Sequence, residues 1–395
     1  MKKLHKFFAV LVALAMMATL CVSMAFAEDG IQAENVDLTK TLTKNAQTTT
    51  PDASFVFKVV KNTTKGDSHA VDIANQTFIY NSTADLTQKK DMDTVFEQAL
   101  ASAPNGMYVY DVMEDAAAST QTNTTADGKT TNTFTYSDKV YRVRIYKSGT
   151  ADAPVYKYTV SEVTGYGTDN EVESKKPVTP GPEAGDEGTI DMPFENKYVK
   201  TTNVTPDGKD PEDDNDAAGL FVQKNVDNDA SNLYADKEFE FTLNATAPAV
   251  NTLSTTKTGY AYKVMKVNGA EDTTKAGTLV PGTPSTVNLK TGERIVFTDL
   301  DVGATVTVKE ADYSADFTAT DKLNGTDVNT IASTNGTTAT ITENGNKLFV
   351  KNTAKNSTTP EGILISNLPY IALALVAIGG LVAYVVVRRR NADEA

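Results

Sequence analysis

The stretch GMYVYDVME (residues 106–114) alternates apolar or aromatic side chains with others and ends on a glutamate. A second stretch, GATVTVKE (residues 303–310), also begins on a glycine and ends on a glutamate. Side chains two positions apart lie on the same face of a β-strand, so Glu114 shares a face with Tyr110 and Val112. The same count places the final glutamate of the second stretch beside two valines. Both stretches therefore predict a strand whose core-facing side carries a carboxylate at its end.

A lysine stands at the same distance before an aromatic strand in each half of the chain. Lys40 is followed fifteen positions later by FVF (residues 55–57), and Lys224 is followed fifteen positions later by FEF (residues 239–241). Each half also closes on a strand-like run that ends in an asparagine, namely Asn196 and Asn352. The two halves are therefore predicted to share one plan.

A lysine, a glutamate and an asparagine on inward faces have a joint chemical use. Burial favours the neutral amine of lysine and the neutral acid of glutamate. A neutral amine is a nucleophile, and the acid can hydrogen-bond the asparagine side chain and relay protons. The amine would displace ammonia from the amide and leave an isopeptide bond. We predict two such self-made crosslinks, each promoted by one glutamate: Lys40–Asn196 with Glu114, and Lys224–Asn352 with Glu310.

Two assignments in the first half have alternatives. Lys44 follows Lys40 closely and could take its place. Glu162 ends the strand-like run YKYTVSE (residues 156–162), which repeats the pattern that leads to Glu114. We favour Glu114 because it stands on the strand after a glycine, as the glutamate of the second half does. The plainer interpretation of all these residues is that they are solvated at strand ends.

The combination resembles the sortase-assembled pilins and adhesins of Gram-positive bacteria. Residues 36–199 resemble a streptococcal pilin isopeptide-linkage domain, through Lys40, the strand that ends at Glu114, residues 136–146 and FENKY (residues 194–198). Residues 217–354 resemble an immunoglobulin-like pilin domain of the collagen-adhesin B type. The resemblance implies a wall-anchored structural protein rather than an enzyme acting on an external substrate.

Short alternating runs occur throughout the chain, and Thr is abundant, which favours strands over helices. Only residues 93–101 indicate a short helix. We therefore predict an all-β fold with two tandem immunoglobulin-like β-sandwich domains between a signal peptide and a C-terminal transmembrane helix. The predicted segments are 1–27 signal peptide, 36–199 first sandwich, 200–216 acidic linker, 217–354 second sandwich, 355–367 stalk and sorting motif, 368–387 transmembrane helix and 388–395 cytoplasmic basic tail.

Both ends of the chain indicate export and anchoring. A basic start, an apolar run and the sequence AFA (residues 25–27) are typical of a secretory signal peptide. Residues 368–387 are uncharged and long enough to cross a bilayer, and three arginines follow. Pro360, Glu361 and Gly362 resemble a sortase motif with glutamate in the threonine position, with cleavage after Glu361. Without sorting, the chain would remain a membrane protein.

Several functions are disfavoured by composition. The single cysteine, Cys21, lies in the predicted signal peptide, which excludes disulfides and thiol catalysis in the exported chain. One histidine, His69, remains there, so we expect no metal site and no cofactor. The formal net charge of −14 argues against nucleic acid as a partner. The acidic run at residues 207–216 lacks the glycine and the final glutamate of an EF-hand, so we interpret it as a linker.

The sequence thus favours a structural pilus subunit in which tension along the fibre passes through the covalent crosslinks and does not separate the strands of the sheets. Its expected partners are a sortase, neighbouring pilin subunits and cell-wall peptidoglycan, with a host surface ligand as a further one. Lys175 and Lys176, in a Pro/Gly-rich insertion, are candidates for the lysine that joins subunits. The alternative function is a monomeric anchored adhesin.

Overall fold

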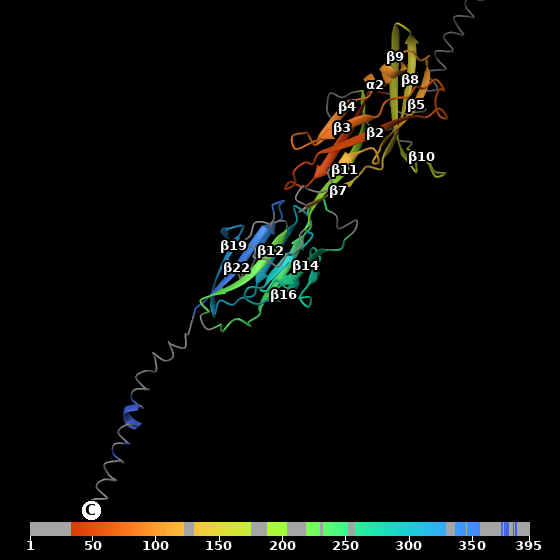
Figure 1. Ribbon diagram of the computed structural model, residues 1–395. Helices are drawn as coiled ribbons and strands as arrows, with labels where there is room; N and C mark the ends of the chain where they lie inside the picture. Colours follow the sequence, from red (N-terminus) through yellow and green to blue (C-terminus); the bar gives the residue numbers. More distant parts are fainter. Residues whose placement is uncertain are drawn as a thin grey trace, which may run out of the picture. The chain divides into compact units, whose positions relative to one another are not determined.

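The computed structural model describes residues 33–121, 130–174, 188–203, 219–229, 232–251, 257–328, 336–344 and 346–355, and scattered residues between 373 and 384. These residues form two compact units; the first ends at Lys200 and the second begins at Thr201 (Figure 1). The predicted signal peptide lies outside the described residues, as does most of the acidic linker. Among the residues that are described, no helix is both long and apolar enough to cross a membrane.

Within its described residues, the first unit is a two-sheet sandwich with one helix. One sheet has the strand order β4-β1-β11-β7, and the other has the order β10-β9-β8-β5-β2-β3 with β6 also paired to β2. The elements are β1 (Asn35–Lys44), β2 (Ala53–Lys61), β3 (Gln76–Tyr80), β4 (Thr87–Asp91), α2 (Asp93–Leu100), β5 (Gly106–Glu114), β6 (Thr120–Gln121), β7 (Thr130–Thr135), β8 (Val140–Thr150), β9 (Ala153–Thr164), β10 (Val172–Glu173) and β11 (Thr189–Thr202).

Alternation builds the core of this unit. In β2, Phe55 and Phe57 are fully buried, while Val56 between them is only partly buried. Phe57 meets Phe194 from the other sheet with ring centroids 4.9 Å apart, edge to face. Helix α2 lies where the sequence predicts a short helix, and it buries Phe96 and Leu100, which are one helical turn apart.

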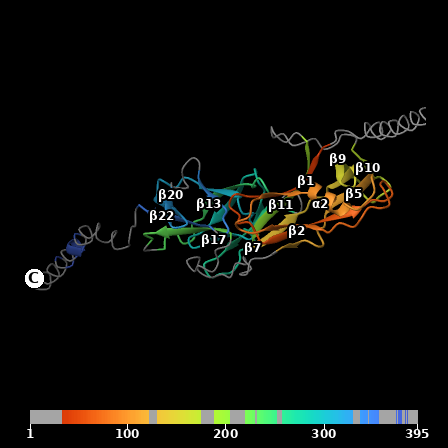
Figure 2. The same ribbon diagram turned by 90° about the horizontal axis from the view of Figure 1, so that it is seen from above.

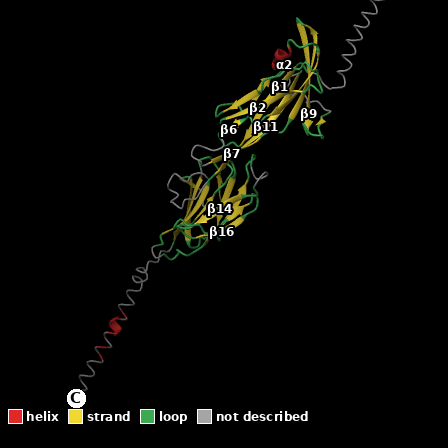
Figure 3. Cartoon of the chain, turned by 45° about the vertical axis from the view of Figure 1, so that its right-hand side comes forward, coloured by secondary structure: helices red, strands yellow, loops and turns green. Residues whose placement is uncertain are grey.

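The second unit is also a two-sheet sandwich, with the strand orders β15-β14-β17-β12-β22-β19-β20 and β16-β13-β18-β21. Strands dominate both units (Figure 3). The elements of the second unit are β12 (Leu220–Asp227), β13 (Phe239–Thr246), β14 (Tyr260–Met265), β15 (Gly277–Leu279), β16 (Ser285–Leu289), β17 (Arg294–Phe297), β18 (Thr305–Glu310), β19 (Phe317–Leu323), β20 (Thr326–Val328), β21 (Thr337–Thr340) and β22 (Asn346–Ala354).

In each unit the first and last strands are parallel neighbours. β1 pairs with β11 (Figure 2). β12 pairs with β22 (Figure 1). A parallel pair needs a long connection, and here nearly the whole unit is that connection. The prediction of an all-β fold with tandem immunoglobulin-like sandwiches is confirmed.

Candidate functional site

The same strand register positions the predicted residues in both units. We call the sheet that holds the parallel pair the lysine sheet and the facing sheet the glutamate sheet. On the lysine sheet, Lys40 lies opposite Phe194. Asn196 is two positions after Phe194, so its side chain lies on the same face of the sheet as that of Lys40. Lys224 lies opposite Val350, and Asn352 is again two positions further along.

The glutamates approach from the glutamate sheet, also in matching register. Glu114 at the end of β5 pairs with Phe57 on β2. Glu310 at the end of β18 pairs with Phe241 on β13. Each phenylalanine is the second aromatic residue of the strand that follows the lysine. Both units therefore bring one lysine, one glutamate and one asparagine together inside the sandwich.

In the first unit, the side chains of the three residues are in hydrogen-bonding contact. Lys40 Nζ lies 3.2 Å from each carboxylate oxygen of Glu114. Asn196 Nδ2 donates to Glu114 Oε1 at 2.7 Å. The Lys40 ammonium also lies over the Phe55 and Phe57 rings, at 4.8 and 5.6 Å from their centroids. The side chains of Lys40 and Glu114 are completely inaccessible to solvent.

The second unit repeats these contacts. Lys224 Nζ lies 2.8 Å from Glu310 Oε1, and Asn352 Nδ2 donates to the same oxygen at 3.1 Å. The Lys224 ammonium lies over the Phe239 ring, 4.4 Å from its centroid. All three polar residues are buried. A single carboxylate thus contacts both the amine and the amide nitrogen in each unit.

Burial shifts the acid–base balance toward the uncharged forms. It lowers the pKa of Lys40 and that of Lys224 to about 8, although the facing carboxylate acts in the opposite direction. Burial also raises the pKa of Glu310 above its ordinary value, against the effect of Lys224. A proton transfer across the pair produces a neutral amine and a neutral acid without changing the net charge of the site.

The alternative residues lie elsewhere. Lys44 Nζ donates to the main-chain oxygen of Thr48 at 2.6 Å. Glu162 lies near the surface, 3.8 Å from Lys139, with 41% of its side chain exposed. The structure therefore places Lys40 and Glu114, and neither alternative, beside Asn196.

The remaining predicted site residues lie outside the described residues. These are Lys175 and Lys176 of the insertion, and Pro360, Glu361 and Gly362 of the sorting element.

Sequence reasoning missed one group at the site, the main-chain N–H of Ser137. It donates to Asn196 Oδ1 at 2.8 Å and to Glu114 Oε2 at 3.1 Å. Ser137 lies between β7 and β8, in a segment without strand pairing. A main-chain donor has no residue-type signature, so only the fold could reveal it.

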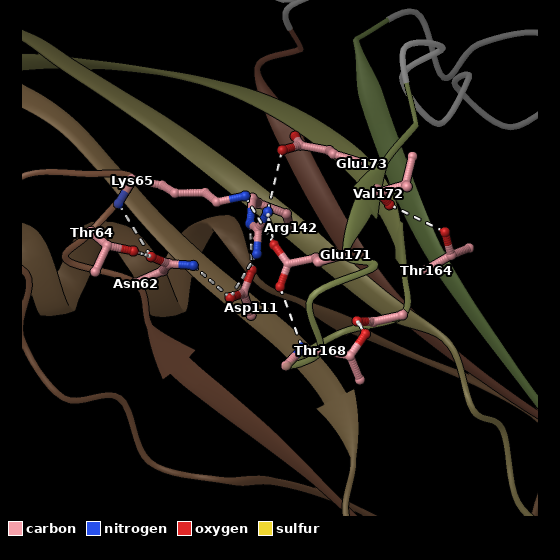
Figure 4. A network of polar contacts seen from close by, with 12 residues as sticks. Asn62, Thr64, Lys65, Asp111, Arg142, Thr164, Thr168, Glu171, Val172 and Glu173 are labelled. Atoms are coloured by element: carbon pink, nitrogen blue, oxygen red, sulfur yellow. Dashed lines mark hydrogen bonds and ion pairs between the residues drawn. The ribbon is translucent and has the colours of Figure 1, made fainter.

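The outer face of the glutamate sheet in the first unit carries a second buried polar cluster that sequence reasoning missed. Arg142 on β8 is fully buried and makes two contacts to Asp111 on β5, at 2.7 and 3.2 Å (Figure 4). The remaining guanidinium nitrogen, Nη1, donates to Glu171 Oε1 at 3.0 Å and to Glu173 Oε2 at 3.3 Å. Asn62 donates to Asp111 at 2.9 Å. This cluster ties β10 and the turn before it to the sheet.

Comparisons with known proteins find one family match and several similar pilus proteins. Residues 218–353 match a family described as a domain of unknown function (DUF7601). A curated relative named Pilin, from Streptococcus pyogenes serotype M1, is 29% identical over 186 residues. The chain is similar to a streptococcal pilin. The match covers 45% of this pilin-like chain and 50% of the relative, so the chain spans about half the length of the curated pilin it matches.

Solved pilus proteins also align with this pilin-like chain. A major pilin of Streptococcus pyogenes is 18% identical, with a TM-score of 0.32, covering 82% of this chain and 99% of that one. A pilus-presented adhesin, Cpa, is 17% identical with a TM-score of 0.24, covering 49% of this chain and 35% of that one. The resemblance to streptococcal pilins that the sequence predicted is confirmed by the curated relative.

Proposed function

We propose that the chain is a structural subunit of a cell-surface pilus and that each of its units closes an intramolecular isopeptide bond. The bonds are Lys40–Asn196 and Lys224–Asn352. The observation that carries the proposal is the repeated set of one buried lysine, one glutamate and one asparagine, in the same register in two sandwiches. Two independent placements of this kind are not expected from solvated strand-end residues.

The chemistry follows from the contacts. Glu114 accepts a proton from Lys40, and the neutral amine then attacks the side-chain carbonyl carbon of Asn196. A new C–N bond forms as the carbonyl electron pair moves to Oδ1. When the pair returns, the bond to Nδ2 breaks. Nδ2 leaves as ammonia, because it receives a proton from Glu114, which contacts it at 2.7 Å. Glu114 then takes the second lysine proton and ends as the neutral acid, and it returns to the carboxylate when that proton passes to the released ammonia or to water.

The bond would join the first strand to the last. Force applied to the two ends of a unit then passes through a covalent link between neighbouring parallel strands. Such a link also restricts the unfolded chain, which stabilises the fold by roughly 5 kcal/mol for a loop of this length on the chain-entropy model.

The crosslinks predict a mass deficit. The intact mass of the recombinant residues 28–355 should be lower than the sequence mass by two molecules of ammonia, because each closure releases one. Peptide mapping should find the deficit in branched peptides that contain Lys40 with Asn196 and Lys224 with Asn352. Replacing Asn196 and Asn352 by alanine should restore the full mass. A wild-type protein of full sequence mass would refute the crosslinks.

The pilus role rests on similarity to the streptococcal pilin, the tandem sandwiches and the predicted terminal signals. We propose export by the signal peptide of residues 1–27, sorting at Pro360, Glu361 and Gly362, and attachment to peptidoglycan or to a neighbouring subunit through a sortase. The domain limits predicted from the sequence are part of this proposal.

Fibre assembly predicts a ladder of covalent multimers in wall extracts. If Lys175 or Lys176 receives the sorted end of the next subunit, replacing both by arginine should remove the ladder. Digests of wild-type fibres should contain a branched peptide that joins one of these lysines to a chain ending at Glu361. A ladder that survives the double replacement would overturn this assignment. Wall extracts that contain monomer alone would favour the anchored adhesin.

A further inference from the structure

The amide of Asn196 is held in one orientation by donors and acceptors on its two sides. Its nitrogen faces the carboxylate, since Nδ2 donates to Glu114 Oε1 at 2.7 Å. Its oxygen faces a main-chain donor, since Oδ1 accepts the N–H of Ser137 at 2.8 Å. Asn196 is fully buried, so these contacts are shielded from water. The amine and the leaving nitrogen thus share the Glu114 carboxylate, while the carbonyl oxygen has a donor of its own.

We propose that the main-chain N–H of Ser137 is the oxyanion donor of the crosslinking reaction in the first unit. This inference rests on the proposed isopeptide chemistry. When Lys40 attacks, the carbonyl electron pair of Asn196 moves to Oδ1, and negative charge develops on that atom. A donor already aimed at it stabilises this charge without having to reorient. The hydrogen bond from Ser137 is kept after the reaction, because Oδ1 becomes the carbonyl oxygen of the isopeptide bond.

The same N–H is shared with the carboxylate before the reaction. Ser137 N lies 3.1 Å from Glu114 Oε2 and 2.8 Å from Asn196 Oδ1. Once Glu114 has taken the lysine proton, its oxygens attract the N–H less strongly, because charged acceptors form the stronger hydrogen bonds. The donor then serves Oδ1 as charge appears there.

The segment that presents this N–H is anchored on both sides. The Tyr136 ring packs edge to face on Phe55, with centroids 6.0 Å apart. Strand β8 begins at Val140 and pairs with β5, the strand that carries Glu114. The donor is therefore fixed relative to the carboxylate.

The second unit differs at this point. Asn352 Nδ2 contacts Glu310, as in the first unit, but Asn352 Oδ1 is buried without a hydrogen-bond partner among the described residues. Glu310 and Asn352 also line a pocket of about 300 Å³. Asn352 Oδ1 itself is inaccessible to solvent, so negative charge that develops on it has no donor in place among the described residues. We therefore expect the first unit to close faster than the second.

The test follows bond formation in refolding protein. Residues 28–355, made unfolded and unlinked, are refolded by dilution and quenched at intervals, and the two branched peptides are quantified by mass spectrometry. Folding is monitored in parallel by circular dichroism. In the wild type, the Lys40–Asn196 peptide should appear before the Lys224–Asn352 peptide. Equal rates, or the reverse order, would contradict the inference.

A backbone substitution tests the donor itself. Replacing Ser137 by its α-hydroxy acid turns the amide into an ester and removes only the N–H. Closure of the first unit should slow by about a hundredfold, the effect of removing one oxyanion donor, while the second unit is unchanged. Two controls keep the N–H of Ser137: Ser137→Ala, and the same ester at Lys139. Both should close at nearly the wild-type rate.

The outcomes separate the two proposals. If wild-type protein forms no bond, the proposed function fails. If bonds form and the folded Ser137 ester closes as fast as the wild type, the oxyanion role fails and the proposed function stands. If the ester variant does not fold, the order of the two wild-type closures decides.

Discussion

Replacing Glu114 by alanine is expected to leave Lys40 and Asn196 unlinked and the first unit much less stable. Without the carboxylate, no group accepts the lysine proton or returns one to the leaving nitrogen. Loss of the bond alone removes roughly 5 kcal/mol on the chain-entropy model. Lys40 also remains in the core without its counter-ion, a situation that typically costs 3–5 kcal/mol, or about as much as the bond. Intact mass and thermal unfolding monitored by circular dichroism measure the two effects.

Glu114→Gln separates the chemistry from the packing. Glutamine has nearly the same volume and can still accept the hydrogen bond from Asn196, but it cannot relay a proton. The intact mass should then be short of the sequence mass by one ammonia instead of two. The loss of stability should be smaller than in Glu114→Ala. Glu310→Ala is the matched control, because it should restore one ammonia in the second unit and leave the Lys40–Asn196 peptide linked. A Glu114→Gln protein that still loses both ammonia molecules would show that this carboxylate is not needed.

Arg142→Met is expected to destabilise the first unit by about 3–5 kcal/mol without affecting either crosslink. The substitution removes the ion pair from Asp111, which is buried at 1% exposure and, among the described residues, keeps neutral donors such as Asn62. Urea unfolding should show a lower midpoint, while the intact mass retains its two-ammonia deficit.

Arg144 provides the matched control for this cluster. Its side chain is 15% exposed and pairs with Glu173, which also contacts Arg142. Arg144→Met should cost less than Arg142→Met, because Glu173 keeps its contact with Arg142. Adding Asp111→Leu to Arg142→Met should recover much of the loss, because no buried charge is then left unpaired. Equal losses for the two arginine variants would contradict the assigned role of Arg142.

The sequence allowed the lysine, glutamate and asparagine of each unit to be placed because side chains alternate between the two faces of a strand. A charged residue in phase with valines and aromatic residues is predicted to face the core, and this holds for Lys40, Glu114 and Glu310. The equal spacing from lysine to aromatic strand supplied the second indication. It reflects the register, in which each glutamate pairs with the second phenylalanine after its lysine.

Alternation alone could not separate the true neighbours from the alternatives. Lys44 faces the same side of its strand as Lys40, and Glu162 ends a run with the same alternation as the run that ends at Glu114. Alternation does not show which strands lie next to each other. The Arg142–Asp111 pair was hidden for a related reason. Both residues are out of phase with the core and resemble ordinary solvent-facing charges. Their burial depends on the pairing of β5 with β8 and on the turn before β10.

The placement of β11 beside β1 has a consequence for the order in which the chain is made. A polypeptide emerges from its N-terminal end, so Lys40 appears first, Glu114 later and Asn196 close to the end of the unit. Contacts between residues so distant in sequence form late in folding, because the intervening chain has to be ordered first. A nascent or truncated chain that lacks β11 has a nucleophile but nothing for it to attack. Closure would therefore mark a unit as complete, and an interrupted chain would remain open to proteolysis.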